Sequence, residues 1–235
     1  MSKLPTRSML AAAALTSVCV GAYSARADEE CGEECTMACC EEATESTQTA
    51  AVDEKAEKKA IPDSMTFLGA DGLPEDFAER IKTNLVPLVG QPAPQLSLSE
   101  FSNTKGFTND DFQGKITIVD VWATWCGPCI AAIPHNNELQ EKYADQGVVF
   151  LGVTTANGQE NLGKAIDQHK IAYPVAKDPE MKTRDAWKAS FYPTYYVVDR
   201  DGVVRGVALH PEKIEEAIEF MLKEQPAPEA TASAR

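Results

Sequence analysis

The sequence has little positive charge, few histidines and, beyond its N-terminus, no apolar run long enough to cross a membrane. Its 235 residues include 22 lysines and arginines, 36 aspartates and glutamates and three histidines, for a formal net charge of −14. This negative net charge excludes nucleic acid as a partner, because binding to phosphate groups needs positive charge on the protein. A spanning helix needs ~20 consecutive apolar residues. What remains is one globular core of moderate size between two dissimilar ends.

Residues 1–27 have the layout of a secretory signal peptide. Two basic residues precede an apolar stretch over 9–22, and Ala25-Arg26-Ala27 provides an Ala-x-Ala cleavage site. We expect cleavage before Asp28 and an exported protein, periplasmic or otherwise extracytoplasmic. An uncleaved N-terminus that tethers the protein to the membrane is the alternative.

Residues 28–62 form an acidic segment that contains cysteines. Between 28 and 60 it carries eleven acids against three lysines. Few large apolar residues interrupt this run, so it cannot bury enough surface to offset the entropy of ordering, and we expect a disordered tether. Three interpretations of its cysteines stay open: local disulfides, intermolecular linkage, or a soft metal ion. The four cysteines are Cys31, Cys35, Cys39 and Cys40.

A second group of cysteines, Cys126 and Cys129, follows a continuous apolar run over 116–122 that is typical of a buried strand. Gly127 and Pro128 start the helix that comes next, so Cys126 is expected at its N-terminus with Cys129 one turn inside. The helix dipole would stabilise a thiolate at Cys126, and Cys129 would be the resolving thiol. Two other roles fit this pair less well. A purely structural disulfide would close a loop too small to stabilise the fold much, and a metal site would need a second pair of ligands.

Short apolar runs alternate with helical patterns through the middle of the chain. This predicts an α/β sandwich with a central mixed sheet flanked by helices over 90–224, preceded by a short helical lead-in over 63–89 and followed by a disordered tail over 225–235. Strands are expected over 116–122, 148–154, 173–176, 195–198 and 203–207, and helices over 129–144, 159–169, 179–188 and 212–222.

These motifs resemble thioredoxin and, more narrowly, the exported TlpA-like and ResA-like thiol-disulfide oxidoreductases. The resemblance extends over about 90–222. It is carried by the run Asp120-Val-Trp-Ala-Thr-Trp125-Cys126-Gly-Pro-Cys129, by Pro134, by Tyr192-Pro193-Thr194, and by the upstream segments Gly90-Gln-Pro-Ala-Pro94 and Asp111-Phe-Gln-Gly-Lys115.

The resemblance implies a thioredoxin-like fold and roles for further residues. Asp120 matches the buried acid that helps to move the proton of the resolving cysteine, and burial would raise its pKa. Pro193 matches a cis-proline that faces the cysteines and offers backbone to a bound substrate. Trp125 and Tyr192 would contact substrate beside it, as would Gly127 and Pro128.

Departures from the family pattern narrow these expectations. Ala132 stands where ResA-like proteins often carry a glutamate, so proton handling would fall to Asp120 or water. His135 and His210 are expected to be capping or surface residues.

The resemblance further implies protein substrates with disulfides or thiols, such as an apocytochrome or a metalloprotein, a membrane electron donor, and no cofactor. One alternative is a peroxiredoxin-like peroxidase, but Ala123 occupies the position where peroxiredoxins usually have a threonine. The other is a copper delivery module that holds Cu(I) through the two thiolates.

Overall fold

The computed structural model describes residues 59–226. The expected signal peptide, most of the tether with its four cysteines, and all but the first two residues of the tail lie outside the described residues. The packed part of the chain already includes Lys59, whose carbonyl accepts from Arg205, and Ile61, which is buried. Packing thus starts within the last residues of the segment assigned to the tether.

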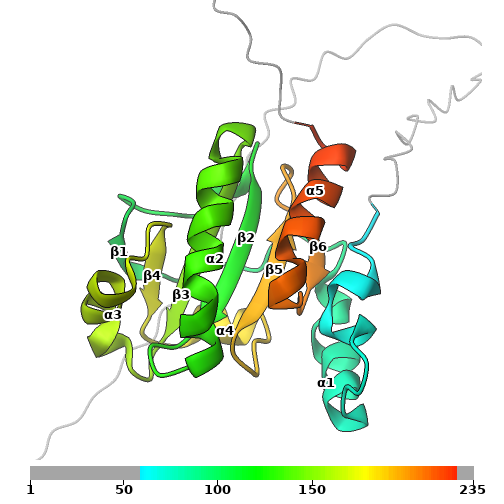
Figure 1. Cartoon of the computed structure of the whole chain (residues 1–235), viewed down its shortest axis with the longest axis horizontal. Helices are drawn as coiled ribbons and strands as arrows, with labels where there is room; N and C mark the ends of the chain where they lie inside the picture. Colours follow the sequence, from blue (N-terminus) through cyan, green and yellow to red (C-terminus); the bar gives the residue numbers. More distant parts are fainter. Residues whose placement is uncertain (1–58, 227–235) are drawn as a thin grey trace, which may run out of the picture. The chain divides into compact units, whose positions relative to one another are not determined.

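Six strands form one mixed sheet in the order β1-β4-β3-β2-β5-β6 (Figure 1). The central strand β2 pairs in parallel with β3 and antiparallel with β5. Both faces of β2 are covered, and all seven of its residues are buried. The strands are β1 (Ser99–Ser102), β2 (Ile116–Trp122), β3 (Val148–Thr155), β4 (Val175–Asp178), β5 (Thr194–Val198) and β6 (Val204–Val207).

Helices cover both faces of this sheet and give it two apolar cores. One core joins the sheet to α2, α3 and α5, and the other joins the opposite face to α1 and to Trp187, which directly follows α4. In Figure 1, α2 and α5 lie across the same face. The helices are α1 (Glu75–Asn84), α2 (Gly127–Tyr143), α3 (Leu162–His169), α4 (Lys182–Ala186) and α5 (Ile214–Glu224). The expected sandwich with a mixed central sheet is confirmed.

Alternation along β2 decides what faces α2. Ile118 and Trp122 belong to the core under α2, whereas Val119 and Val121 belong to the opposite core. Since successive side chains of a strand point to opposite faces, Asp120 shares the face of Ile118 and Trp122. A carboxyl group is thereby buried beneath the helix that carries the two cysteines.

Several expected boundaries were wrong. The strand expected over 173–176 is β4, which begins two residues later at Val175, directly after Pro174, and extends to Asp178. Proline has no backbone N–H to donate to a neighbouring strand. The helix expected over 179–188 is regular only over α4, and a 3-10 turn over Gln159–Asn161 precedes α3. The edge strand β1 was not predicted, since its four residues show no clear alternation. Gly147 ends the 3-10 turn after α2 in a left-handed conformation, with φ of 72°.

Within residues 59–226, no helix combines the length and the apolar character that crossing a membrane requires.

Candidate active site

Cys126 and Cys129 form a disulfide at the start of α2, just after the loop that connects it to β2. The two Cα atoms are 5.2 Å apart, and Cys126 is the N-cap residue of the helix. The backbone N–H of Cys129 donates to the Sγ atom of Cys126 over 3.2 Å. Cys126 is 5% exposed and Cys129 only 1%. An amide at a helix N-terminus is thus directed at one sulfur, the arrangement that stabilises a thiolate there.

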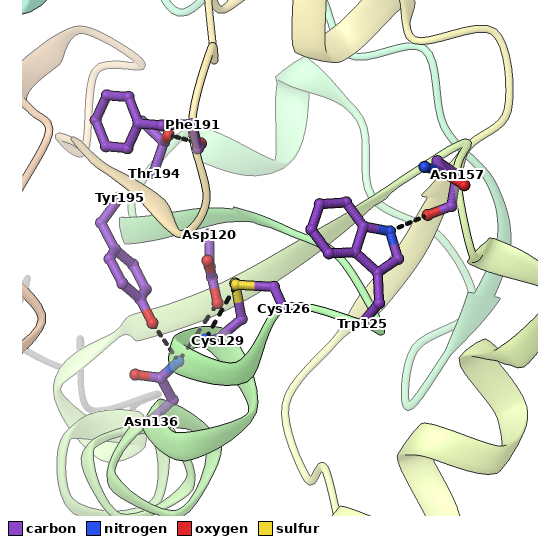
Figure 2. Close-up of a disulfide and its surroundings, with 9 residues drawn as sticks. All are labelled: Asp120, Trp125, Cys126, Cys129, Asn136, Asn157, Phe191, Thr194 and Tyr195. Atoms are coloured by element: carbon purple, nitrogen blue, oxygen red, sulfur yellow. Dashed lines mark hydrogen bonds between the residues drawn. A yellow bond between two sulfur atoms is a disulfide. The ribbon is translucent and has the colours of Figure 1, made fainter. Parts of the chain in front are cut away.

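Asp120 lies under this pair in a buried polar cluster. The Nδ2 atom of Asn136 is 3.5 Å from the Oδ2 atom of Asp120 and donates to the Tyr195 hydroxyl over 3.0 Å (Figure 2). Asn136 shares the buried face of α2 with Cys129, seven positions earlier. The other carboxylate oxygen, Oδ1, has no hydrogen-bond partner among residues 59–226.

Burial dominates the electrostatics of this cluster. It raises the pKa of Asp120 to about 8, against a smaller lowering by the Tyr195 hydroxyl. The pKa of Tyr195 and that of Tyr173 are raised as well, first by burial and then by the Asp120 charge. Near neutral pH, Asp120 can therefore both hold and release a proton.

Trp125 projects from the start of the site instead of joining the core. It is 58% exposed, while Trp122 is buried. Its indole N–H donates to the Asn157 carbonyl over 3.0 Å, and its ring meets Tyr192 edge to face at 5.9 Å (Figure 2 shows the former contact). These two aromatic side chains thus stand together at the rim beside Cys126.

The peptide bond between Tyr192 and Pro193 is cis. Pro193 is buried directly before β5, and the Thr194 hydroxyl closes the turn by donating to the Phe191 carbonyl. This turn lines the same groove as Pro128, next to the disulfide. The structure therefore brings the expected proline turn and the start of α2 together.

A groove of about 840 Å³ extends away from the disulfide. Its far wall comes from the lead-in: Phe77 stacks edge to face on Phe191 at 4.7 Å, and Phe67 on both of them at 5.9 to 6.0 Å. Arg80 of α1 donates to the Ser190 hydroxyl, which fixes the lead-in against the proline turn. The groove is lined by Phe67, Phe77, Pro128, Ala131, Ala132, His135, Phe191, Tyr192, Pro193, His210, Pro211 and Glu212.

Both histidines singled out in the sequence line this groove. His210 caps the turn that leads into α5, accepting from the N–H of Glu212 over 3.4 Å, and its ring packs on Phe67 at 5.1 Å. His135 is half-buried on α2, 4.0 Å from the carboxylate of Glu138. Capping is confirmed for His210. Among residues 59–226, no three side chains of His, Cys, Asp or Glu gather into a group that could hold a metal ion.

Sequence reasoning missed three parts of the site. Asn136 and Tyr195 complete the buried cluster, and the spacing of Cys129, Ile133 and Asn136 on one helix face was a signal for the first. The Asn157 carbonyl and Gly158 position Trp125 from a loop after β3. No local pattern indicated that contact, because the loop follows Trp125 by more than thirty residues.

Comparison with known proteins agrees with this geometry. The Redoxin family model matches residues 88–221. The thioredoxin-like protein YneN of Bacillus subtilis is 34% identical over 120 residues, which cover 50% of this chain and 69% of that protein. The thiol-disulfide oxidoreductase ResA of Oceanobacillus iheyensis is 28% identical over 127 residues, 53% of this chain and 66% of that one.

Among solved structures, a candidate thiol:disulfide interchange protein DsbE from Chlorobium tepidum is similar with a TM-score of 0.51 and 28% identity. The match covers 58% of this chain and 96% of that one. The fold and the paired cysteines define the class as a thiol-disulfide oxidoreductase with a thioredoxin-like fold. The chain belongs to the Redoxin family.

Proposed function

We propose that this protein reduces disulfides of exported proteins, with Cys126 as nucleophile and Cys129 as resolving thiol. The single observation that carries the proposal is the helix amide of Cys129 directed at the sulfur of Cys126. The difference in burial supports the same assignment, because the less buried Cys126 is the one that a substrate disulfide can approach.

The reaction is a two-step exchange of sulfur bonds. The Cys126 thiolate attacks a substrate disulfide, one Cys126–substrate bond forms, and one substrate sulfur leaves as thiolate. The Cys129 thiolate then attacks Cys126, which releases the second substrate thiolate. Two electrons pass to the substrate, and the Cys126–Cys129 disulfide remains.

Asp120 is proposed to accept the proton of Cys129 in the second step. Its raised pKa suits a base that works near neutral pH. Its Oδ1 atom has no protein partner among residues 59–226, so a water molecule can bridge it to the thiol. Asn136 holds the other oxygen, which would fix the orientation of the carboxyl group.

The substrate chain is proposed to lie against the cis turn. Pro193 and Tyr192 offer backbone and ring on one side of the disulfide, and Trp125 stands exposed beside them. Gly127 and Pro128 are exposed at the start of α2, where Gly127 carries no side chain to obstruct an approaching polypeptide.

The substrates would be apocytochromes or assembling metalloproteins. A membrane protein would return electrons to the Cys126–Cys129 pair. The likeness to ResA and DsbE proteins supports an extracytoplasmic location, as does the N-terminal sequence. An uncleaved N-terminus would keep the protein at the membrane.

Insulin-disulfide reduction with dithiothreitol as donor tests the proposal. Cys126→Ser is expected to abolish turnover, because the attacking sulfur is lost. Cys129→Ser should form a mixed disulfide yet fail to turn over. Retention of insulin reduction by Cys126→Ser would overturn the mechanism.

The reduction potential of the Cys126–Cys129 pair tests the direction in which electrons flow between this protein and its substrates. A value near about −270 mV, as in thioredoxin, would support a reductant, whereas one near about −120 mV, as in DsbA, would make the protein an oxidant.

A further inference from the structure

The groove beside the disulfide has a wall that the family match does not include. Phe67 and Phe77 line the groove, yet both precede residue 88, where the match to the Redoxin family begins. We propose that this wall is a subsite for an aromatic side chain that a substrate polypeptide carries a few residues from its reacting cysteine. The inference rests on the proposed function of Cys126 and deepens it by naming a feature of the substrate.

Backbone contacts with the chain that follows β6 hold the wall in place. The N–H of Phe67 donates to the Ala208 carbonyl over 2.9 Å. The N–H of His210 donates to the Met65 carbonyl over 3.0 Å. Helix α1, which carries Phe77, lies at the β6 side of the sheet (Figure 1). A wall that is ordered in this way loses little conformational entropy when a ligand binds.

The aromatic rings of the wall keep accessible surface for an occupant. Phe67, Phe77 and Phe191 contact one another edge to face, with ring centroids 4.7 to 6.0 Å apart. Each of the three is only half-buried, and all three line the groove. Aromatic pairs prefer such edge-to-face contacts, so a further ring can join this cluster on the groove side. The volume of about 840 Å³ is large enough for one.

The groove is continuous with the place where substrate is proposed to bind. Pro128, two residues after Cys126, lines the groove together with Tyr192 and Pro193 of the cis turn. A polypeptide bonded to Cys126 lies against this turn in the proposed function. The residues next to its cysteine are therefore placed at the groove, where the aromatic wall can select among them.

The polar groups of the groove favour a polypeptide over a lipid. No lysine or arginine is among the lining residues, all of which belong to the described chain, so a phosphate headgroup finds no cationic partner there. The Nδ1 atom of His210 accepts from the N–H of Glu212 over 3.4 Å, so the neutral ring carries its proton on Nε2. This second N–H can donate to a backbone carbonyl, which a polypeptide offers at every residue.

Synthetic peptides test the subsite with the full chain. Each peptide has a single cysteine joined to glutathione in a background of serine and glycine, and one phenylalanine replaces a serine two to five residues before or after the cysteine. With dithiothreitol as donor, we expect one placement to raise kcat/KM at least about 10-fold over the peptide without phenylalanine. The gain should lie in KM, because the added ring does not take part in the exchange of sulfur bonds.

Variants of the wall test which side chains read the phenylalanine. Phe77→Ala and Phe67→Ala should each reduce the ratio of the two kcat/KM values, with and without phenylalanine, to below about 3. The ratio compares two substrates of one variant, so a partial loss of folded protein cancels. Phe101→Ala is the matched control: Phe101 is half-buried on β1 and does not line the groove, and its variant should keep the ratio of wild type.

Two results would overturn the subsite. One is equal kcat/KM for all peptides with wild-type protein, and the other is a ratio that neither wall variant changes. A second copy of this chain is the rival occupant, which light scattering detects. We expect the same oligomeric state in wild type and Phe77→Ala, and a wild-type dimer that Phe77→Ala dissociates would assign the wall to self-association instead.

The peptide without phenylalanine separates this inference from the proposed function. Its reduction without any preference for phenylalanine would remove only the subsite. Failure of wild-type protein to reduce any of the peptides or insulin would count against the proposed function itself.

Discussion

At the scale of a single residue, the burial of Asp120 affects both the stability of the fold and proton transfer at the site. Its burial under α2 raises its pKa to about 8, so the folded protein keeps a proton there that the unfolded chain releases above its ordinary pKa of about 4. The stability that this proton contributes is complete below pH 4 and is lost as the pH rises from 4 to 8. The same property makes Asp120 suitable as a proton acceptor.

Asp120→Asn should therefore stabilise the fold while it slows turnover. At pH 7 the free energy of unfolding should rise by up to about 4 kcal/mol, at about 1.36 kcal/mol for each pH unit above the unfolded pKa. The slope of stability against pH between 4 and 8 should flatten, and insulin reduction should fall about 100-fold.

Urea titrations across this pH range provide the measurement. Asp167→Asn, on the exposed face of α3, is the control and should leave slope and rate unchanged. A slope in Asp120→Asn equal to that of wild type would contradict the assignment.

Two adjacent tyrosines separate the effect on Asp120 from a general loss of packing. Tyr195 faces the cluster and lowers the pKa of Asp120, so Tyr195→Phe should raise that pKa further. Tyr196 points to the opposite face, where its hydroxyl donates to the Trp187 carbonyl over 2.8 Å. Tyr196→Phe should cost about 1 kcal/mol of stability without moving the titration of Asp120. Carbon NMR of the labelled Asp120 carboxyl group distinguishes the two variants. Identical titrations of Asp120 in both variants would exclude its contact with Tyr195.

At the scale of elements, the loop after β3 positions the rim of the site. Gly158 has φ of 87°, and a Cβ atom there would lie 2.7 Å from the Thr124 hydroxyl and 2.8 Å from the Trp125 ring. The Thr124 hydroxyl also donates to the Gly158 carbonyl over 2.7 Å. The loop and the start of the active-site turn therefore fit only while position 158 lacks a side chain.

Gly158→Ala is expected to displace the Trp125 ring and to cost about 1–3 kcal/mol of stability, because both conformation and contact become strained. Iodide quenching of tryptophan fluorescence and the KM for insulin should change together. Gly163→Ala is the control: nothing lies within 4 Å of its added carbon inside α3, so it should be neutral or stabilising by about 0.5–1 kcal/mol. Unchanged quenching in Gly158→Ala would refute the positioning role.

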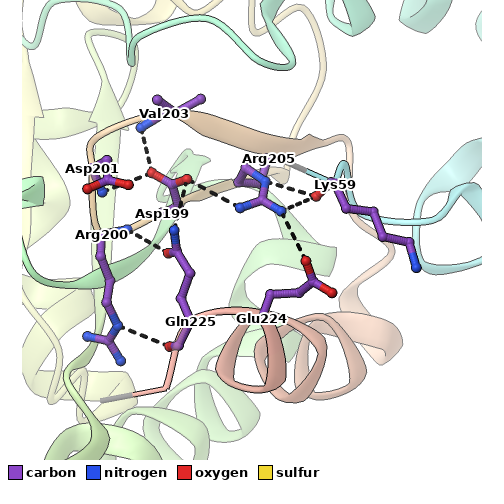
Figure 3. A network of polar contacts seen from close by, with 8 residues as sticks. All are labelled: Lys59, Asp199, Arg200, Asp201, Val203, Arg205, Glu224 and Gln225. Atoms are coloured by element: carbon purple, nitrogen blue, oxygen red, sulfur yellow. Dashed lines mark hydrogen bonds and ion pairs between the residues drawn. The ribbon is translucent and has the colours of Figure 1, made fainter. Parts of the chain in front are cut away.

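At the scale of the whole molecule, one buried ion pair joins both ends of the described chain to the sheet. Arg205 of β6 contacts Lys59 near the start and Glu224 in the last turn of α5, and it pairs with the buried Asp199 between them (Figure 3). Gln225 adds a contact to Arg200 in the adjoining hairpin turn. None of these residues lines the groove beside the disulfide, so we expect the network to serve the fold and not the chemistry.

Arg205→Met should destabilise the protein by about 3–5 kcal/mol, because a buried carboxylate loses its guanidinium partner. The reduction potential of the cysteine pair should stay within error of wild type. Lys82→Met, an exposed control on α1, should change stability by less than about 1 kcal/mol. Thermal unfolding and redox titration check both, and a shifted potential in Arg205→Met would show that the network reaches the active site.

The sequence by itself determined the class of fold, the position of Cys126 before a helix, and the burial of Asp120. Each of these follows from a local pattern: apolar runs of strand length, Gly-Pro at a helix start, and the position of Asp120 inside the continuous apolar run over 116–122. These patterns could be interpreted without knowledge of distant segments, and the cysteines and the proline turn carried a recognisable resemblance.

Only the tertiary structure decided which distant residues meet at the site. Asn136 and Tyr195 reach Asp120 from a helix and a neighbouring strand, Gly158 makes room for Trp125, and Phe77 closes a groove on Phe191. Edge strand β1 likewise exists through its pairing with β4. Such contacts depend on how the layers pack, and residues far apart in the chain leave no local pattern that specifies their pairing.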